Sequence, residues 1–164
     1  MEILAADRIN EIIKRMAIEI LEENYEEKEI YLAGINNNGY LFAKILAKEL
    51  EKIAEQEIHL IRLKLNPANP ISEEVELSLE AKKLKNKVVL IVDDVANTGR
   101  TIFYAYKPLL SVVCKRVQVA VLVDRKHKSF PVAVDFTGIS LATTMKEDIQ
   151  VKLDKVKERT VSLV

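Results

Sequence analysis

Two adjacent aspartates and a short polar loop follow an apolar run in the stretch VVLIVDDVANTGRT, residues 88–101. The carboxylates of Asp93 and Asp94 suit the hydroxyls of a polyol or the water shell of a metal ion. The loop from Asn97 to Thr101 supplies two hydroxyls, an amide, a guanidinium and a glycine that lets the backbone turn tightly. It precedes a predicted helix, whose free N–H groups favour an anion. The stretch therefore predicts a sugar-phosphate site, with the acids at the ribose hydroxyls and the loop at the phosphate.

Three other structures would also bring residues of these types together. Phosphoacceptor receiver domains carry paired aspartates at a strand end, but in their first strand, much earlier than residue 88. A nucleotide-binding P-loop needs a lysine after its last glycine, whereas Gly99 is followed by Arg100. A simple turn with Thr98 or Thr101 as the helix cap would leave the two aspartates unexplained. The sugar-phosphate site is the leading hypothesis.

The elements that position this site follow from the spacing of apolar residues. Helical periodicity predicts a first helix that ends near residue 24 and further helices over 40–56 and 101–113, with a turn over 34–39 before the second helix. Apolar runs predict strands at 29–35, 58–65, 88–92 and 117–124, and shorter strands near 75–79 and at 132–139, 149–154 and 159–164. This alternation predicts an α/β fold with a mostly parallel central sheet flanked by helices, whose ligands bind where strands run into helices.

Composition sets limits on the class of protein. We expect residues 1–164 to form a single domain, since a chain of this length can bury one sizeable core. Lysine plus arginine and aspartate plus glutamate number 25 each, so the net charge gives no reason to coat nucleic acid or a membrane. One cysteine and two histidines exclude an internal disulfide and a zinc cluster of the usual spacing. With neither a basic, apolar leader nor a membrane-length apolar segment, the expected location is the cytoplasm.

The same stretch resembles a known signature. VVLIVDDVANTGRT is similar to the phosphoribosyl pyrophosphate motif of type I phosphoribosyltransferases: an apolar strand, two acids and a small-residue loop ending Thr-Gly-Arg-Thr. The chain most resembles the branch of pyrimidine operon attenuation regulators that double as uracil phosphoribosyltransferases. The segments that carry this resemblance are RMAIEILEEN (15–24), YLAGINNNGYLFAKILAKEL (31–50), VQVAVLVDRKHKSFPVAVDFTGISL (117–141) and IQVKLD (149–154).

The resemblance implies a role for each part of the site. Asp93, Asp94 and Arg125 would act in catalysis, and Asp93, Asp94 and Asp124 would hold Mg²⁺ directly or through its water shell. The 5′-phosphate would be cradled by Ala96, Asn97, Thr98, Gly99, Arg100 and Thr101. The pyrophosphate would meet Asn36, Asn37, Asn38 and Gly39, and the base would meet Val134, Asp135 and Phe136. Small C-terminal strands would form a hood over the site.

The resemblance also implies an activity and partners. The expected enzyme is a Mg²⁺-dependent, dimeric phosphoribosyltransferase that joins uracil or another pyrimidine to phosphoribosyl pyrophosphate and releases pyrophosphate. The first alternative is a weakly catalytic or non-catalytic regulator that senses phosphoribosyl pyrophosphate or nucleotides and binds RNA or a protein, and the second is a dimeric structural relic of such an enzyme. RNA is the less favoured partner, because the polar face of the first helix is as acidic as it is basic.

Two loops depart from the family pattern. The pyrophosphate loop of the family usually carries Lys-Thr-Arg before its glycine, where this chain has Asn36, Asn37 and Asn38. The lid usually starts with a Tyr-Arg-Asp-Asp-like segment, where this chain has LKLN at 63–66 followed by a shortened excursion to residue 88. Both changes remove charge that would clamp the leaving group, so we expect turnover to suffer more than ligand binding.

Overall fold

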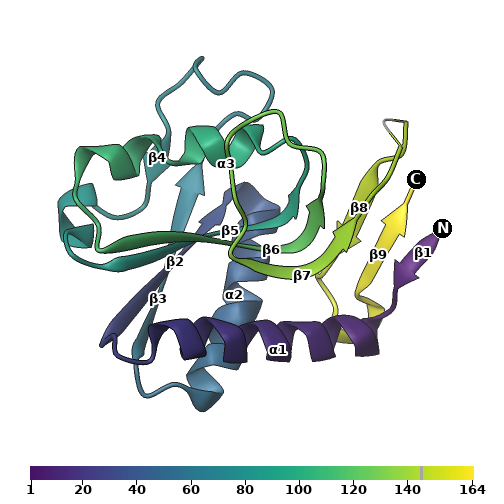
Figure 1. Cartoon of the computed structure of the whole chain (residues 1–164), viewed down its shortest axis with the longest axis horizontal. Helices are drawn as coiled ribbons and strands as arrows, with labels where there is room; N and C mark the ends of the chain where they lie inside the picture. Colours follow the sequence, from purple (N-terminus) through teal and green to yellow (C-terminus); the bar gives the residue numbers. More distant parts are fainter. Residues whose placement is uncertain (145) are drawn as a thin grey trace.

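The computed structural model describes residues 1–144 and 146–164 and is built around a six-stranded sheet with strand order β4-β3-β2-β5-β6-β7 (Figure 1). Only β4 runs antiparallel to its neighbour. The strands are β2 (Glu29–Ile35), β3 (Glu57–Lys64), β4 (Glu76–Leu77), β5 (Val88–Ala96), β6 (Arg116–Arg125) and β7 (Phe136–Leu141). This confirms the predicted α/β fold with a mostly parallel central sheet.

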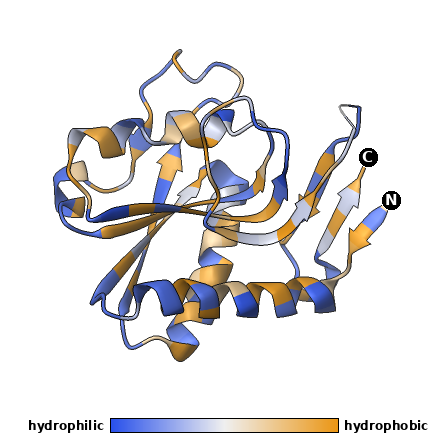
Figure 2. Ribbon diagram, in the orientation of Figure 1, coloured by the Kyte–Doolittle hydropathy of each residue, from blue (hydrophilic) through white to orange (hydrophobic). Residues whose placement is uncertain are grey.

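Helices cover both faces of this sheet (Figure 1). On one face lie α1 (Ala6–Asn24) and α2 (Asn36–Ile53), and on the other α3 (Arg100–Ala105) with the 3₁₀ segments η1 (Ala81–Leu84) and η2 (Lys107–Ser111). Side chains along a strand alternate between faces, so Leu90 packs with the residues of α1 and α2 while Val89 and Ile91 pack with those of α3. Figure 2 shows hydrophobic and hydrophilic residues alternating along α1, as a helix with one buried face requires.

A second sheet of three antiparallel strands stands beside the first, and both chain termini lie in it (Figure 1). Its order is β1-β9-β8, with β1 (Glu2–Leu4), β8 (Ile149–Lys152) and β9 (Thr160–Leu163); η3 (Val156–Glu158) connects the last two. The C-terminal strands match the predicted hood. The strand β1 was not predicted, because three residues carry no periodic pattern and the pairing with β9 alone makes them a strand.

Three element boundaries differ from prediction in ways that matter for the site. Strand β5 continues to Ala96, so both aspartates lie inside the strand and not after it. Helix α2 begins at Asn36, directly after β2, where a turn was expected. The predicted helix over 101–113 ends at Ala105 and continues as a 3₁₀ segment, because Pro108 lacks an N–H and restricts the residue before it.

None of the helices in residues 1–144 and 146–164 is both long and apolar enough to cross a bilayer.

Candidate active site

A cavity of about 460 Å³ lies at the carboxyl-terminal edge of the parallel sheet. Its wall combines the first turn of α2, the end of β5, the following loop and the first residue of β8 from the second sheet. The lining residues are Ile35, Asn36, Asn37, Asn38, Pro67, Asp93, Asp94, Val95, Asn97, Thr101 and Ile149. The structure thus brings the three asparagines, both acids and part of the polar loop around one space, as expected for parallel strands that end at a shared edge.

The acid pair Asp93 and Asp94 lines this cavity. Oδ1 of Asp93 accepts a hydrogen bond from the Asp94 N–H (2.9 Å), and Oδ1 of Asp94 accepts one from the Val95 N–H (3.0 Å). Although the residue Asp93 is only half-buried, its carboxyl group is desolvated. Burial first, and then the adjacent charge of Asp94, raise the pKa of Asp93 well above its ordinary value. The two carboxylates therefore form a site that a cation or a hydrogen-bond donor would stabilise.

The asparagine segment is the start of a helix and not a flexible loop. Asn36 has a positive φ of 51°, a conformation that asparagine tolerates better than most residues, and its Oδ1 accepts a hydrogen bond from the Leu65 N–H (3.0 Å). Asn36 therefore ties α2 to the end of β3. Asn37 and Asn38 are exposed and line the cavity.

The glycines on either side of this segment have a packing role. A Cβ at Gly34 would lie 2.4 Å from Cα of Tyr40, and one at Gly39 would lie 2.7 Å from the Val92 carbonyl oxygen and 3.0 Å from Oδ1 of Asp93. Glycine at position 39 is what lets the first turn of α2 approach the acid pair.

The loop predicted to bind phosphate curls around a small hollow of about 50 Å³. The hollow is lined by Asp93, Val95, Ala96, Asn97, Thr98, Gly99, Arg100, Thr101 and Ile102. Gly99 has a φ of 84°, which residues with a Cβ rarely adopt, and the Thr98 carbonyl accepts the N–H groups of Ser129 and Phe130. The loop is thus held from behind by the segment that follows β6. The Arg100 guanidinium donates to the Ala68 carbonyl (3.1 Å), so it reaches the excursion after β3.

Asp124 and Arg125, at the end of β6, are engaged elsewhere. Oδ1 of Asp124 accepts a hydrogen bond from the Lys128 ammonium (2.6 Å) in a largely buried ion pair. Nη2 of Arg125 donates to the carbonyls of Thr144 (2.5 Å) and Glu147 (2.6 Å). Neither residue is among the described residues that line the two cavities. In this structure Arg125 anchors the segment that leads into β8.

The residues predicted to meet the base do not line the cavity. Phe136 begins β7 and pairs with Ala120, which in turn pairs with Val92, the residue before the acid pair, so Phe136 lies two strands away from β5. Oδ2 of Asp135 accepts the Val119 N–H (2.7 Å), and Phe136 is buried in the core. The structure therefore does not bring Val134, Asp135 and Phe136 to the cavity.

Four residues that line the cavity were not among the predicted site residues: Ile35, Pro67, Val95 and Ile149. Ile35 and Val95 lie in strands that the sequence did predict. Ile149 opens a strand that was predicted, but a local pattern cannot tell that β8 turns back toward β5. Pro67 belongs to the excursion after β3, where two prolines indicated only an exposed loop.

Comparisons of the fold identify the class of protein. The Phosphoribosyl transferase domain family matches residues 1–155. The fold is shared with a hypoxanthine-guanine phosphoribosyltransferase of Bacillus anthracis, at TM-score 0.76 and 15% identity over 100% of this chain and 96% of that one. It is shared also with the hypoxanthine phosphoribosyltransferase of Trypanosoma cruzi, at TM-score 0.80 and 15% identity over 99% and 94% of the two chains. The fold is that of a type I phosphoribosyltransferase.

Comparisons of sequence narrow the class to one branch. A "Bifunctional protein PyrR" of Macrococcus caseolyticus is 34% identical over 96% of this chain and 94% of its own length. Another, of Pediococcus pentosaceus, is 31% identical over 99% and 97%. The chain belongs to the phosphoribosyl transferase domain family of transferases, in the branch of the PyrR bifunctional proteins. The branch indicated by the sequence motifs is confirmed.

Proposed function

We propose that the 460 Å³ cavity binds phosphoribosyl pyrophosphate and transfers its phosphoribosyl group to a pyrimidine base, uracil first, with release of pyrophosphate. One observation carries the proposal: the acid pair, the polar loop and the first turn of α2 meet around a single space at the edge of the sheet where ligands bind in such folds. The match of residues 1–155 to the phosphoribosyl transferase domain family supports the same activity.

The residue types match what the reaction demands. Breaking the bond between the anomeric carbon and pyrophosphate creates positive charge on the sugar and negative charge on the leaving group, so positioning and charge stabilisation matter more than a nucleophile. Asp93 and Asp94 would hold the ribose hydroxyls, and residues 96–101 would hold the 5′-phosphate by backbone N–H groups and hydroxyls. The free N–H groups at the start of α2, an 18-residue helix, would face the pyrophosphate.

A divalent magnesium ion fits the acid pair. Protein-bound Mg²⁺ commonly uses one or two carboxylates and completes its shell with water and substrate phosphate oxygens. Burial and the neighbouring charge of Asp94 raise the pKa of Asp93, and a bound cation would favour the charged form of this carboxyl group. Asp124 would join the shell only through water or after release of Lys128. Bound there, the ion would neutralise charge on the departing pyrophosphate.

The base would enter on the side of the second sheet. Ile149 is the apolar side chain of the cavity that comes from β8, and it would pack against the flat ring of a pyrimidine.

We infer further that the protein acts in the cytoplasm as a homodimer. Sedimentation would measure the oligomeric state directly.

The deciding experiment follows pyrophosphate release with Mg²⁺, phosphoribosyl pyrophosphate and a panel of pyrimidine and purine bases. We expect turnover with uracil and its loss in the double variant Asp93→Asn, Asp94→Asn. The matched control is Asp154→Asn, an exposed acid outside the cavity, which should leave turnover unchanged. Equal activity in the double variant and the control would place the ribose site elsewhere.

A second candidate function is a sensor with little turnover. It is favoured by the charged residues that line the 460 Å³ cavity and a second, separate groove. Among the described residues that line the 460 Å³ cavity there is no lysine or arginine to meet a pyrophosphate. A separate groove of about 540 Å³ between α1 and α2 is rimmed by Lys14, Lys44, Lys48, Lys52 and Arg159, with Glu49 and Asp154 as its acids. This groove is therefore locally positive, although the net charge of the whole chain is zero.

Tight ligand binding without turnover, together with RNA affinity better than about micromolar at physiological salt, would favour this second function. Brisk turnover with weak RNA binding, which we expect, would favour the first.

A further inference from the structure

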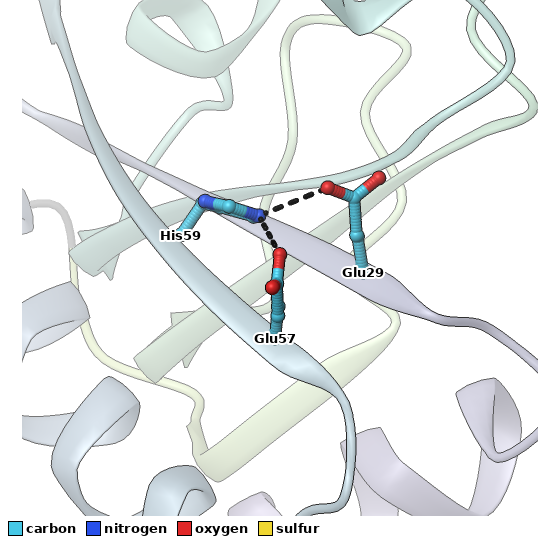
Figure 3. A group of neighbouring side chains, drawn as sticks. All are labelled: Glu29, Glu57 and His59. Carbon is cyan, nitrogen blue, oxygen red and sulfur yellow. Dashed lines mark hydrogen bonds and ion pairs between the residues drawn. The ribbon is translucent and has the colours of Figure 1, made fainter.

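Three side chains with metal-binding atoms gather at the end of the sheet opposite the cavity (Figure 3). Glu29 begins β2 and Glu57 begins β3, and the two residues pair across the parallel ladder. His59 lies two residues after Glu57, so its side chain stands on the same face of the sheet. Six residue steps along β2, or about 20 Å, separate this cluster from the cavity. It is therefore not part of the site proposed for phosphoribosyl transfer.

The distances in the cluster suit a small metal ion. Nε2 of His59 lies 3.2 Å from Oε1 of Glu29 and 3.3 Å from Oε2 of Glu57, and one ligand atom from each of the three residues lies within 4.8 Å of the others. Zinc bonds to nitrogen and oxygen of about 2.0–2.2 Å give a tetrahedron with edges of about 3.3–3.6 Å. The two nitrogen–oxygen separations, 3.3 Å and 3.2 Å, lie at the lower limit of that range and 0.1 Å below it, so these atoms need little movement to close on an ion.

The imidazole is held in place and the cluster stays open to water. The ring of His59 stacks on that of Tyr31, with centroids 4.4 Å apart and planes inclined by 16°. The side chains of His59 and Glu29 are 35% and 25% exposed, and that of Glu57 is 73% exposed. An ion can therefore reach the cluster and keep water in its remaining coordination positions.

One neighbouring cation competes with a metal for this cluster. The Lys87 ammonium, from the segment just before β5, pairs with Oε2 of Glu29. It leaves Oε1 of Glu29 facing His59, but it places a positive charge beside the metal position. Removal of that charge should therefore strengthen metal binding.

We propose that Glu29, Glu57 and His59 bind a divalent transition-metal ion that clips together the amino-terminal ends of β2 and β3. One imidazole with two carboxylates selects zinc, cobalt or manganese over magnesium, which prefers oxygen ligands alone. The competing reading of the same geometry is an ion-pair network in which a protonated His59 bridges the two glutamates.

The test titrates the intact protein with Co²⁺ alone and follows its visible absorption, with wild type and three variants. The chain has two histidines, which supplies a matched control: His127 is exposed in the turn after β6. Wild type and His127→Gln should bind one equivalent with the same affinity. His59→Gln should bind at least about ten-fold more weakly. Lys87→Met should bind several-fold more tightly, which an ion-pair network would not show.

Two further variants test the same site independently of His59. Glu57→Gln changes an exposed side chain that the fold does not need, so it should weaken binding in a protein of unchanged melting temperature even if His59→Gln proves unstable. The double variant Asp93→Asn, Asp94→Asn should keep the Co²⁺ signal, which separates this site from the cavity. Equal affinity in wild type, His59→Gln and Glu57→Gln, or loss of the signal in His127→Gln, would overturn the proposal.

Discussion

At the scale of single residues, the site holds the Asp93 carboxyl in surroundings that disfavour its charged form. The Asp93 carboxyl is desolvated and stands beside Asp94, so its pKa is raised. The native state therefore holds a proton on this group at pH values where the unfolded chain has released it. Its contribution to stability is complete below the ordinary pKa of about 3.9 and is lost as pH rises through the raised native pKa.

Asp93→Asn should for this reason stabilise the unliganded protein at pH 7 while abolishing its response to Mg²⁺ with phosphoribosyl pyrophosphate. The asparagine keeps the Oδ1 acceptor for the Asp94 N–H but carries no charge. We expect a rise in melting temperature of about 2–4 °C for each kcal/mol of desolvation and repulsion that the substitution relieves. Melting curves from pH 3 to pH 8 check this. The gain should vanish below about pH 4, and a gain that persisted there would assign it to another cause.

The three asparagines at positions 36–38 differ in backbone conformation and exposure, although they are the same residue type. Asn36 has a positive φ and its side chain holds Leu65, so a charged residue at this position would strain the backbone. Asn37 and Asn38 are exposed toward the cavity and can accept replacement. Charge lost from the family pattern can therefore be restored at 37 and 38, not at 36.

Asn37→Lys with Asn38→Arg should raise turnover more than it raises affinity for phosphoribosyl pyrophosphate, since charge on the leaving group is largest in the transition state. Each ~1.4 kcal/mol regained gives about ten-fold in kcat. Steady-state pyrophosphate release compares this variant with wild type, and Asn36→Lys serves as the misplaced control. Fast wild-type turnover that the new charges leave unchanged would show that the N–H groups of α2 already suffice.

At the scale of elements, the direct join between β2 and α2 decides the shape of the site. Because no loop intervenes, the first turn of α2 is pressed against β5, and Gly39 is the point of contact with Val92 and Asp93. The predicted helix after the phosphate loop is cut short at Pro108, which leaves α3 only six residues long.

Gly39→Ala should cost about 1–3 kcal/mol of folding stability, as overpacking of a close contact does. The added methyl group would push α2 from the acid pair, so turnover should fall as well. Thermal unfolding and the pyrophosphate assay measure the two effects. Lys44→Ala, an exposed change on the same helix, should alter neither; a Gly39→Ala protein as stable as that control would show that α2 can shift without loss.

At the scale of the whole molecule, the cavity needs both sheets. The large sheet supplies the acids, the loop and the start of α2, while β8 of the small sheet supplies Ile149. The small sheet is itself assembled from both ends of the chain, with the Met1 ammonium donating to the Leu163 carbonyl (2.6 Å). Residues more than a hundred positions apart thus share one binding surface.

Ile149→Ala should reduce kcat/KM for the base by roughly 5-fold to 150-fold, from about 1–3 kcal/mol of lost apolar contact. The KM for phosphoribosyl pyrophosphate should change little, because its predicted partners lie on the large sheet. Ile53→Ala removes the same atoms from a half-exposed position at the end of α2 and is the matched control. A change of equal size in the two KM values would place Ile149 outside the base site.

The sequence by itself determined the fold class, the order of the main elements and the motif of residues 88–101. All three features depend on local patterns. Apolar periodicity indicates which face of an element is buried, and an acid pair before a glycine loop indicates one strand–loop–helix unit. Comparison of the sequence with the family pattern also located the departure from Lys-Thr-Arg at Asn36–Asn38, because that departure is a difference in residue type.

Only the tertiary structure decided which of these residues meet. Sheet order left Val134–Phe136, at and before the start of β7, two strands away from β5 and outside the cavity, and ladder register set Glu29 beside Glu57. The return of the chain after β6 brought Lys128 to Asp124, and the backbone carbonyls of the segment before β8 captured Arg125. Such pairings depend on how strands align and where connections return, and a pattern read along the chain carries no information on either.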